Sequence, residues 1–232
     1  MTGAVSEARI DAALACLARL GGEDEQVWSE AGTALAVTRK PWELHGDFSG
    51  QILLIEKTDL VVAADASLYD RAGLTRALAS AGVSPDGFTP TALIEAAYRA
   101  WGPALAEHLV GDYAFVLWDR RLRRLVAARD PLGMRTLYWA KLGDRVAVAS
   151  SSRALAELAG RADTLNLASL GAQVAGLIWS NGTDPAYVGV DPVPAAHRLI
   201  WEAGRSRLER FWHPPVAPDR RPTDAAEAAL EL

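Results

Sequence analysis

Residues 98–138 decide the fold, and they read YRAWGPALAEHLVGDYAFVLWDRRLRRLVAARDPLGMRTLY. Hydrophobic spacing changes along this stretch from the helical repeat to the alternation of strands. The predicted elements, in order, are helix 98–109, strand 113–118, turn 119–124, strand 125–128, turn 129–133 and strand 136–138. We expect the two strands around the charged turn to pair as an antiparallel hairpin, with the side chains of Phe115 and Leu117 on opposite faces.

The same patterns recur along the rest of the chain. Further strand-like runs cover 33–38, 51–56, 60–64, 137–139, 145–149, 198–201 and 207–210. Helical patterns cover 9–20, 70–81, 89–108, 151–158 and 166–175. Strands joined as hairpins, with helices placed between the hairpins, indicate an α+β fold with antiparallel sheets.

Composition excludes several classes of protein. The chain has 232 residues, half of them hydrophobic, and a formal net charge of −5 with acidic and basic residues mixed, so we expect a globular domain and no nucleic-acid-binding surface. Cys16 is the only cysteine, which excludes a disulfide framework and a cysteine-based metal site, and its helical spacing places it in the core. No apolar run approaches the length of a membrane span, so we expect a cytoplasmic protein.

The sequence of residues 98–138 resembles that of the glutaminase domain of asparagine synthetases and related class II (N-terminal nucleophile) glutamine amidotransferases. That family typically reads Y-x-x-W-G-x-x-x-x-x-x-L-x-G-x-F-A-F-A-x-W-D, followed by A-R-D-x-x-G-x-x-P-L-Y. Three other stretches resemble family patterns, namely 61–70, 188–199 and 210–214. The resemblance implies an α-β-β-α sandwich of two antiparallel sheets.

The resemblance also implies a domain plan. Residues 1–213 correspond to the amidotransferase-like domain, 214–222 to a proline-rich linker, and 223–232 to the start of an ATP-dependent synthetase domain. Asp224 and Glu227 are spaced as a capping box, which predicts a helix start there. In the family, ATP and Mg²⁺ belong to the downstream synthetase domain, so we expect no cofactor in residues 1–213.

A class II glutaminase needs an N-terminal nucleophile, an oxyanion hole, a guanidinium for the substrate carboxylate and a carboxylate for the substrate amine. The family begins M-C-G, but this chain begins with Met1, Thr2 and Gly3. A threonine hydroxyl is a much weaker nucleophile than a thiolate at neutral pH. Thr2 is therefore a remote candidate for the nucleophile, and an ordinary strand residue is the alternative.

At two of the other three functional positions, this chain also lacks the residues that the family uses. The oxyanion pair N-G of the family falls on Asp65 and Ala66, and an ionised carboxylate would repel a developing oxyanion. The aspartate that the family uses for the substrate amine falls on Pro90. Only Arg39 matches the arginine for the substrate carboxylate, and an exposed strand arginine is an equal alternative. We therefore expect that this domain does not hydrolyse glutamine.

Arg129, Asp130 and Gly133 form the R-D-x-x-G signature of the family. We interpret them as structural, with Asp130 bracing the turn and Gly133 adopting a positive φ. The alternative is that they line a passage to a partner domain. No grouping of residues predicts a metal site.

The stretch 65–71 distinguishes among the relatives. It reads D-A-S-L-Y-D-R, which resembles the D-A-R-L-D-N-R of lasso peptide cyclases more than the N-G-E-I-Y-N of the glutaminases. Such cyclases join a peptide amine to an acidic side chain of the same peptide and need no ammonia. This resemblance implies a precursor peptide and a leader-peptide protease as partners. From the mixed charge and the absence of a long apolar run in the sequence, we expect neither nucleic acid nor a membrane as a partner. A diverged asparagine synthetase, a β-lactam synthetase-like enzyme and a non-catalytic scaffolding or peptide-binding domain are the alternatives.

Overall fold

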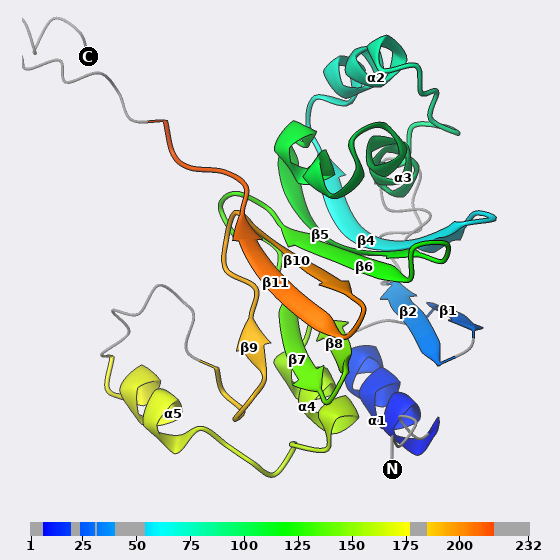
Figure 1. Cartoon of the computed structure of the whole chain (residues 1–232). Coiled ribbons are helices and arrows are strands. Elements are labelled where there is room, and N and C mark those ends of the chain that lie inside the picture. Colours follow the sequence, from blue (N-terminus) through cyan, green and yellow to red (C-terminus); the bar gives the residue numbers. More distant parts are fainter. Residues whose placement is uncertain (1–6, 20–23, 31, 40–53, 177–184, 216–232) are drawn as a thin grey trace, which may run out of the picture.

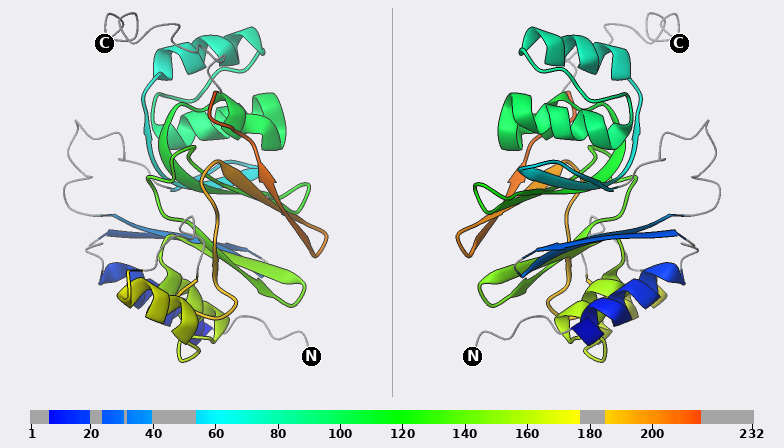
Figure 2. Two further views of the ribbon diagram at one scale, coloured as in Figure 1. Left: turned by 90° about the vertical axis from the view of Figure 1, so that its left-hand side faces the viewer. Right: turned by 90° about the vertical axis from the view of Figure 1, so that its right-hand side faces the viewer.

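Stacked antiparallel sheets lie between two layers of helices (Figure 2). The computed structural model describes residues 7–19, 24–30, 32–39, 54–176 and 185–215. The helices are α1 (Glu7–Ala18), α2 (Arg71–Ser80), α3 (Pro90–Trp101), the 3₁₀ helix η2 (Gly102–His108), α4 (Ser152–Ala159) and α5 (Leu167–Val174). The strands are β1 (Asp24–Glu30), β2 (Thr33–Arg39), β3 (Leu54–Glu56), β4 (Leu60–Leu68), β5 (Gly111–Asp119), β6 (Arg124–Arg129), β7 (Tyr138–Leu142), β8 (Arg145–Ala149), β9 (Asp191–Pro192), β10 (His197–Glu202) and β11 (Arg205–Arg210).

The first sheet has six strands in the order β11-β10-β6-β5-β4-β3, all antiparallel (Figure 1). The opposite layer consists of the pair β1-β2 and the three-stranded sheet β8-β7-β9. Helix α3 covers the outer face of the six-stranded sheet, α2 packs against α3 farther from the sheet, and α1 and α4 lie beyond the opposite layer (Figure 2). This arrangement confirms the predicted α-β-β-α sandwich.

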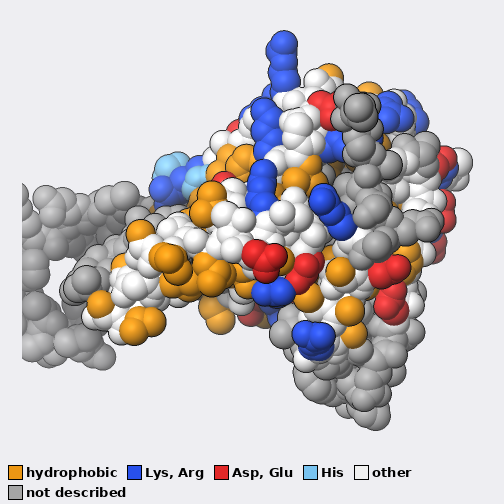
Figure 3. All heavy atoms as spheres, turned by 90° about the horizontal axis from the view of Figure 1, so that it is seen from below, with side chains coloured by type: hydrophobic (Ala, Val, Ile, Leu, Met, Phe, Trp, Pro, Cys, Tyr) orange, Lys and Arg blue, Asp and Glu red, His pale blue; other side chains and the backbone are white. Residues whose placement is uncertain are grey.

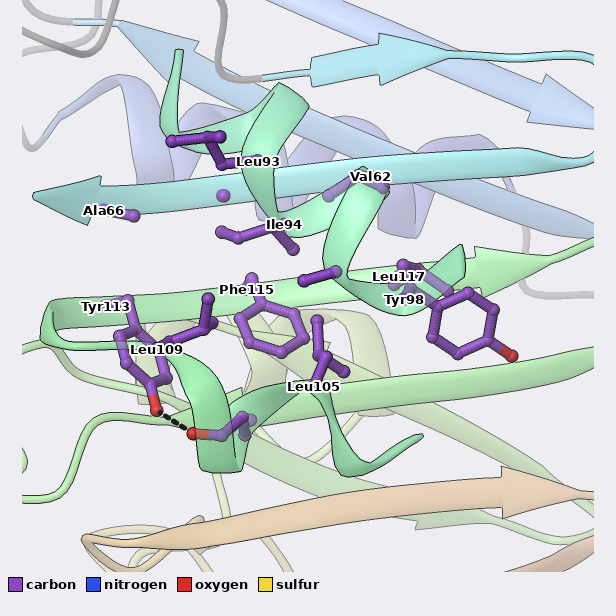
Figure 4. Close-up of a cluster of buried hydrophobic side chains, with 14 of the residues drawn as sticks. Val62, Ala66, Leu93, Ile94, Tyr98, Leu105, Leu109, Tyr113, Phe115 and Leu117 are labelled. Atoms are coloured by element: carbon purple, nitrogen blue, oxygen red, sulfur yellow. Dashed lines mark hydrogen bonds between the residues drawn. The ribbon is translucent and has the colours of Figure 1, made fainter. Parts of the chain in front are cut away.

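The hairpin predicted from the 98–138 stretch is present, with β5 and β6 paired from Ala114–Arg129 to Asp119–Arg124. Our expectation that Phe115 and Leu117 lie on opposite faces was wrong. Both side chains are buried in the core under the helices (Figure 4), because residues two apart in a strand share a face. The intervening Val116 packs on the other face, between the sheets.

Among the described residues, three clusters of buried hydrophobic side chains hold the layers together: one between the helices α2 and α3 and the six-stranded sheet, one between the stacked sheets, and one between α4 and the strands β7 and β8. The core between the helices and the six-stranded sheet includes Leu93, Leu105 and Tyr113, each fully buried (Figure 4). The Tyr113 hydroxyl donates a hydrogen bond to the carbonyl of Ala106 at 3.1 Å, so this buried polar atom is satisfied. Burial raises the pKa of Tyr113, and the negative charge of Asp130 adds to the shift.

The core between the stacked sheets is built mainly of aliphatic and tryptophan side chains: Trp28, Leu35, Val61, Ala114, Trp118, Leu125, Ala127, Leu137, Val193 and Leu199. Trp28 and Leu35 come from β1 and β2, directly opposite each other in register. Side chains alternate between the two faces of β5, so this strand contributes to the core under the helices and to the core between the sheets. Its odd-numbered residues face the helices and its even-numbered residues face the second layer.

The predicted helix over 89–108 is two elements. Helix α3 begins after Thr89, whose hydroxyl accepts the N–H of Ala92 at 3.3 Å. It ends at Gly102, where φ is +56°, and Pro103 then follows in the 3₁₀ helix η2. The single-helix prediction was wrong because a glycine with positive φ followed by proline interrupts the α-helical hydrogen bonds.

Strand β1 was not predicted, and helix α1 extends from residue 7 to residue 18 where the pattern predicted 9–20. The predicted strand over 51–56 is described only as β3, since 51–53 lie outside the described residues. The linker and the helix start predicted for 214–232 lie almost wholly outside them as well.

The face seen from below in Figure 3 has hydrophobic side chains gathered on its left, where Figure 1 places α5. The exposed hydrophobic residues of this segment are Leu165, Leu167 and Val174. In the part of the chain that the structure describes, no helix combines the length and the apolar character needed to cross a membrane.

Candidate functional site

The candidate site lies at one end of the six-stranded sheet, where β4 ends, β5 begins and the turn after β6 crosses. The register pairs Asp65 with Ala114 and Ser67 with Asp112. Because Asp65 and Ser67 are two residues apart in β4, their side chains share the face that looks toward the second layer. The Asp65 carboxylate is about half exposed, at 51%.

Arg135 holds these two side chains together. Its guanidinium lies 3.3 Å from the Asp65 carboxylate and also donates a hydrogen bond to the Ser67 hydroxyl at 3.3 Å. The guanidinium of Arg135 thus compensates the negative charge of Asp65, the residue predicted to lie at the family's oxyanion position. Our sequence reasoning missed Arg135. The available signal was the charge itself, since a carboxylate in place of an asparagine amide favours a cation nearby.

Asp130 fixes the turn that carries Arg135. Its carboxylate is fully buried and accepts three backbone N–H groups, from Leu132 at 3.1 Å, Met134 at 2.9 Å and Arg135 at 3.0 Å. Gly133 closes the turn with a φ of +70°, and its N–H donates to the Asp130 carbonyl at 3.1 Å. A single carboxylate thereby orders the backbone that positions the Arg135 guanidinium.

Arg129 completes the same turn from the end of β6. Its guanidinium donates to the backbone carbonyls of Arg135 at 2.6 Å, Gly133 at 2.7 Å and Val193 at 3.0 Å. The bond to the Val193 carbonyl links the turn to the segment that connects β9 to β10. The Arg129 guanidinium therefore stabilises the backbone of this domain, in line with the structural role that we predicted for it.

Ala66 is the residue predicted to stand where the family has the glycine of its oxyanion pair. It lies within the regular antiparallel pairing of β4 with β5, opposite Tyr113, and only 7% of it is exposed. Among the described residues, the non-glycine positions with positive φ do not include Ala66. The backbone here is thus ordinary strand, and the Ala66 methyl group contributes to the core under the helices.

A second polar group lies at the same end of the sheet. The Tyr69 hydroxyl donates to the Asp112 carboxylate, and this bond raises the pKa of the Tyr69 phenol. Arg71 donates to the carbonyls of Leu68 at 3.1 Å and Phe88 at 3.3 Å. Arg71 thus ties the end of β4 to the segment that enters α3.

Pro90 is brought to this end of the sheet by the same connection. It is the first residue of α3 and is buried. Proline at the first position of a helix costs no hydrogen bond, because that N–H has no partner within the helix. Pro90 begins the helix, and a proline supplies no carboxylate at this position, which the sequence predicts to be that of the family's amine-binding aspartate.

The described residues do not place the remaining predicted site residues at this end of the sheet. Arg39 is the last residue of β2, in register with Asp24, and its side chain lies outside the description, as does all of Thr2. Cys16 is half-buried in α1, not fully in the core as predicted. Within the described ranges, no group of three His, Cys, Asp or Glu side chains is placed to hold a metal ion.

Two stacked antiparallel sheets between helical layers define the fold of the N-terminal-nucleophile amidotransferases. Among solved structures, the chain resembles glutamine phosphoribosylpyrophosphate amidotransferase from Bacillus subtilis in complex with ADP and GMP, with a TM-score of 0.57. That match has 18% identity and covers 88% of this chain and 46% of the other, so it shows the fold alone.

The family follows from the sequence match. Residues 2–212 match the family described as "Glutamine amidotransferase domain", and the chain belongs to it. The chain is 24% identical over 203 residues to asparagine synthetase [glutamine-hydrolyzing] 3 of Bacillus subtilis, covering 85% of this chain and 32% of that protein. It is 42% identical over 65 residues to a putative asparagine synthetase [glutamine-hydrolyzing] of Mycobacterium tuberculosis. This match covers 28% of this chain and 10% of that protein. The chain thus spans about a third or less of the length of these relatives.

Proposed function

We propose that this domain does not hydrolyse glutamine and belongs to an asparagine synthetase-like, ATP-dependent ligase that closes a macrolactam in a lasso peptide. The observation that carries the proposal is the Asp65–Arg135 ion pair. Glutamine hydrolysis develops negative charge on an oxyanion, which needs uncommitted donors aimed at it. Here a carboxylate occupies that position, and the nearby guanidinium already serves Asp65 and Ser67.

The chemistry of the ligase explains why such a loss is tolerated. A ligase that amidates with ammonia needs a glutaminase to release the ammonia. A ligase that uses an amine of its own peptide substrate has no such need, so the oxyanion position is free to change. The D-A-S-L-Y-D-R reading of residues 65–71, which resembles the cyclase pattern, supports the second kind.

One alternative has an observation in its favour. Several of the curated relatives are named asparagine synthetases, and the match to one of them covers 85% of this chain. A diverged asparagine synthetase that takes free ammonia would also tolerate the ion pair at the oxyanion position. The two proposals differ in the amine that attacks the activated carboxylate.

The proposed ligase activates a carboxylate with ATP and Mg²⁺, which we assign to a synthetase domain outside residues 1–213. Its further partners would be a precursor peptide and a leader-peptide protease, with the reaction taking place in the cytoplasm. The domain described here would then serve the ligase as a structural unit.

The experiment uses the product of the complete reading frame that contains this domain. With ATP, Mg²⁺ and a peptide that has a free N-terminal amine and one acidic side chain, we expect a product lighter than the peptide by one water, measured by mass spectrometry. The same peptide with an acetylated N-terminus is the control and should stay unchanged. Amidation of free aspartate by ammonia, with the peptide left untouched, would establish the asparagine synthetase alternative.

A further inference from the structure

Strand β11 closes one edge of the six-stranded sheet (Figure 1). It pairs with β10 over its whole length, from Arg205 to Arg210. Within the described ranges, no strand pairs with its outer side. Such an edge presents a row of backbone donors and acceptors that another extended segment can bind.

The register shows which backbone groups point outward. The two-residue turn Ala203–Gly204 has positive φ at both positions, 49° and 78°, as in a type I′ hairpin. Glu202 and Arg205 flank this turn as a hydrogen-bonded pair. Because hydrogen-bonded and non-hydrogen-bonded pairs alternate in an antiparallel ladder, Arg207 and Glu209 also direct their backbone groups toward β10. The bond from the Phe211 N–H to the Ala196 carbonyl, at 2.9 Å, fits this alternation. Three residues of β11 therefore direct their N–H and C=O groups outward: Ser206, Leu208 and Arg210.

The hairpin is basic in an acidic chain. Residues 197–210 contain four arginines and two glutamates, a net charge of +2, whereas the whole chain has −5. Arg207 is 59% exposed and shares Glu209 with Arg198. Arg205 and Arg210 are exposed, and neither has a carboxylate partner among the residues that the structure describes. Guanidinium groups thus stand along the free edge.

This charge selects among the possible occupants. In a pairing of β11 with β11 of a second copy centred on Leu208, Arg207 would lie opposite Glu209, whereas Arg205 would lie opposite Phe211 and Arg210 opposite Ser206. A second copy would therefore compensate the charge of this edge only in part. An acidic strand would place carboxylates beside the same guanidinium groups. Leu208, 39% exposed, adds an apolar contact in the middle of the edge.

We propose that the outer edge of β11 binds an extended acidic peptide segment, which adds to the six-stranded sheet as a further strand. Backbone hydrogen bonds to Ser206, Leu208 and Arg210 would supply affinity, and the flanking arginines would select acidic side chains. This proposal does not depend on which amide the ligase forms.

The probe is a fluorescein-labelled octapeptide that alternates valine and glutamate, titrated with the 232-residue chain and followed by fluorescence anisotropy. We expect saturable binding that weakens several-fold in high salt. An octapeptide that alternates valine and lysine is the matched control and should bind at least about tenfold more weakly. Equal binding of the two peptides would contradict charge selection at the edge.

A backbone variant tests whether the peptide pairs as a strand. Leu208→Pro removes one outward N–H without removing a bond to β10, and edge strands tolerate proline at such positions. We expect it to weaken binding of the acidic peptide about tenfold, whereas Leu208→Ala, which keeps the N–H, should weaken it about threefold or less. Equal losses in the two variants would show that the backbone takes no part.

A charge variant tests the proposal even if Leu208→Pro does not fold. Arg205→Glu combined with Arg207→Glu should reverse the preference, so that the lysine peptide binds better than the glutamate peptide. Sedimentation velocity of the unmodified chain should show a monomer without peptide. Self-association that Leu208→Pro abolishes would overturn the proposal, because the occupant of the edge would then be a second copy.

Discussion

Replacing Asp130 with alanine should lower the free energy of unfolding by about 3 kcal/mol, because three backbone N–H groups lose one buried acceptor. The carboxylate is fully buried, and its bonds to Leu132, Met134 and Arg135 are 2.9–3.1 Å long. Hydrogen bonds to a charged group exceed neutral ones in strength, and no side chain remains in the variant to replace them. Urea denaturation followed by tryptophan fluorescence measures the change.

Asp70→Ala is the matched control for this prediction. Asp70 caps helix α2, where its exposed carboxylate accepts the N–H of Gly73 at 2.8 Å. Its loss should cost about 1 kcal/mol, the usual value for a helix cap. If both variants lose the same stability, Asp130 does not hold the turn as the structure indicates.

Replacing Gly111 with alanine should lower the free energy of unfolding by about 4 kcal/mol, since the new methyl group has no room. A Cβ there would lie 2.2 Å from the carbonyl oxygen of Ser67 and 2.9 Å from the Cα of Leu68. Both are backbone atoms of β4, so the strands must separate to admit it. The φ of +150° adds strain for any side chain.

Gly82→Ala separates these two causes. Gly82 also has a positive φ, +75°, but a Cβ there would meet no atom within 4 Å. It should cost about 1 kcal/mol, from backbone strain alone. Similar losses for the two variants, measured by the same denaturation experiment, would mean that the contact between β4 and β5 is looser than described.

The sequence predicted the layered fold because its hydrophobic patterns are strong where the core is. Strands β5 and β6 and helix α2 are within one or two residues of their predicted bounds, since each carries a clear repeat bounded by polar turns. Strand β1 was missed because its pattern is weak. Its sequence is DEQVWSE, in which Trp28 is buried while Val27 is 52% exposed.

Two errors came from the interpretation of signals that were present. Gly102 and Pro103 lie together in the sequence and mark the end of α3, yet the helical spacing of the leucines on either side led to one long helix. Phe115 and Leu117 are two residues apart, which places them on one face of any strand. Both errors were avoidable from the residues alone.

The candidate site was only partly predictable, because its decisive contact joins distant parts of the chain. The positions of Asp65 and Ala66 were visible in the family pattern, but Arg135 lies 70 residues from Asp65. What brings the two together is the turn that Asp130 orders after β6, and its exact course follows from three-dimensional packing. A single sequence contains no direct signal of such a pairing.

Ammonia release measures directly whether this domain hydrolyses glutamine, which we propose it does not. The purified 232-residue chain is incubated with glutamine, and ammonia is measured with coupled glutamate dehydrogenase against a blank without protein. We expect no release above the blank, with Thr2→Ala indistinguishable from the unmodified chain, because residue 2 is a threonine and Asp65, paired with Arg135, lies where we propose the oxyanion position to be. Steady turnover that disappears in Thr2→Ala would contradict the claim and identify Thr2 as the nucleophile.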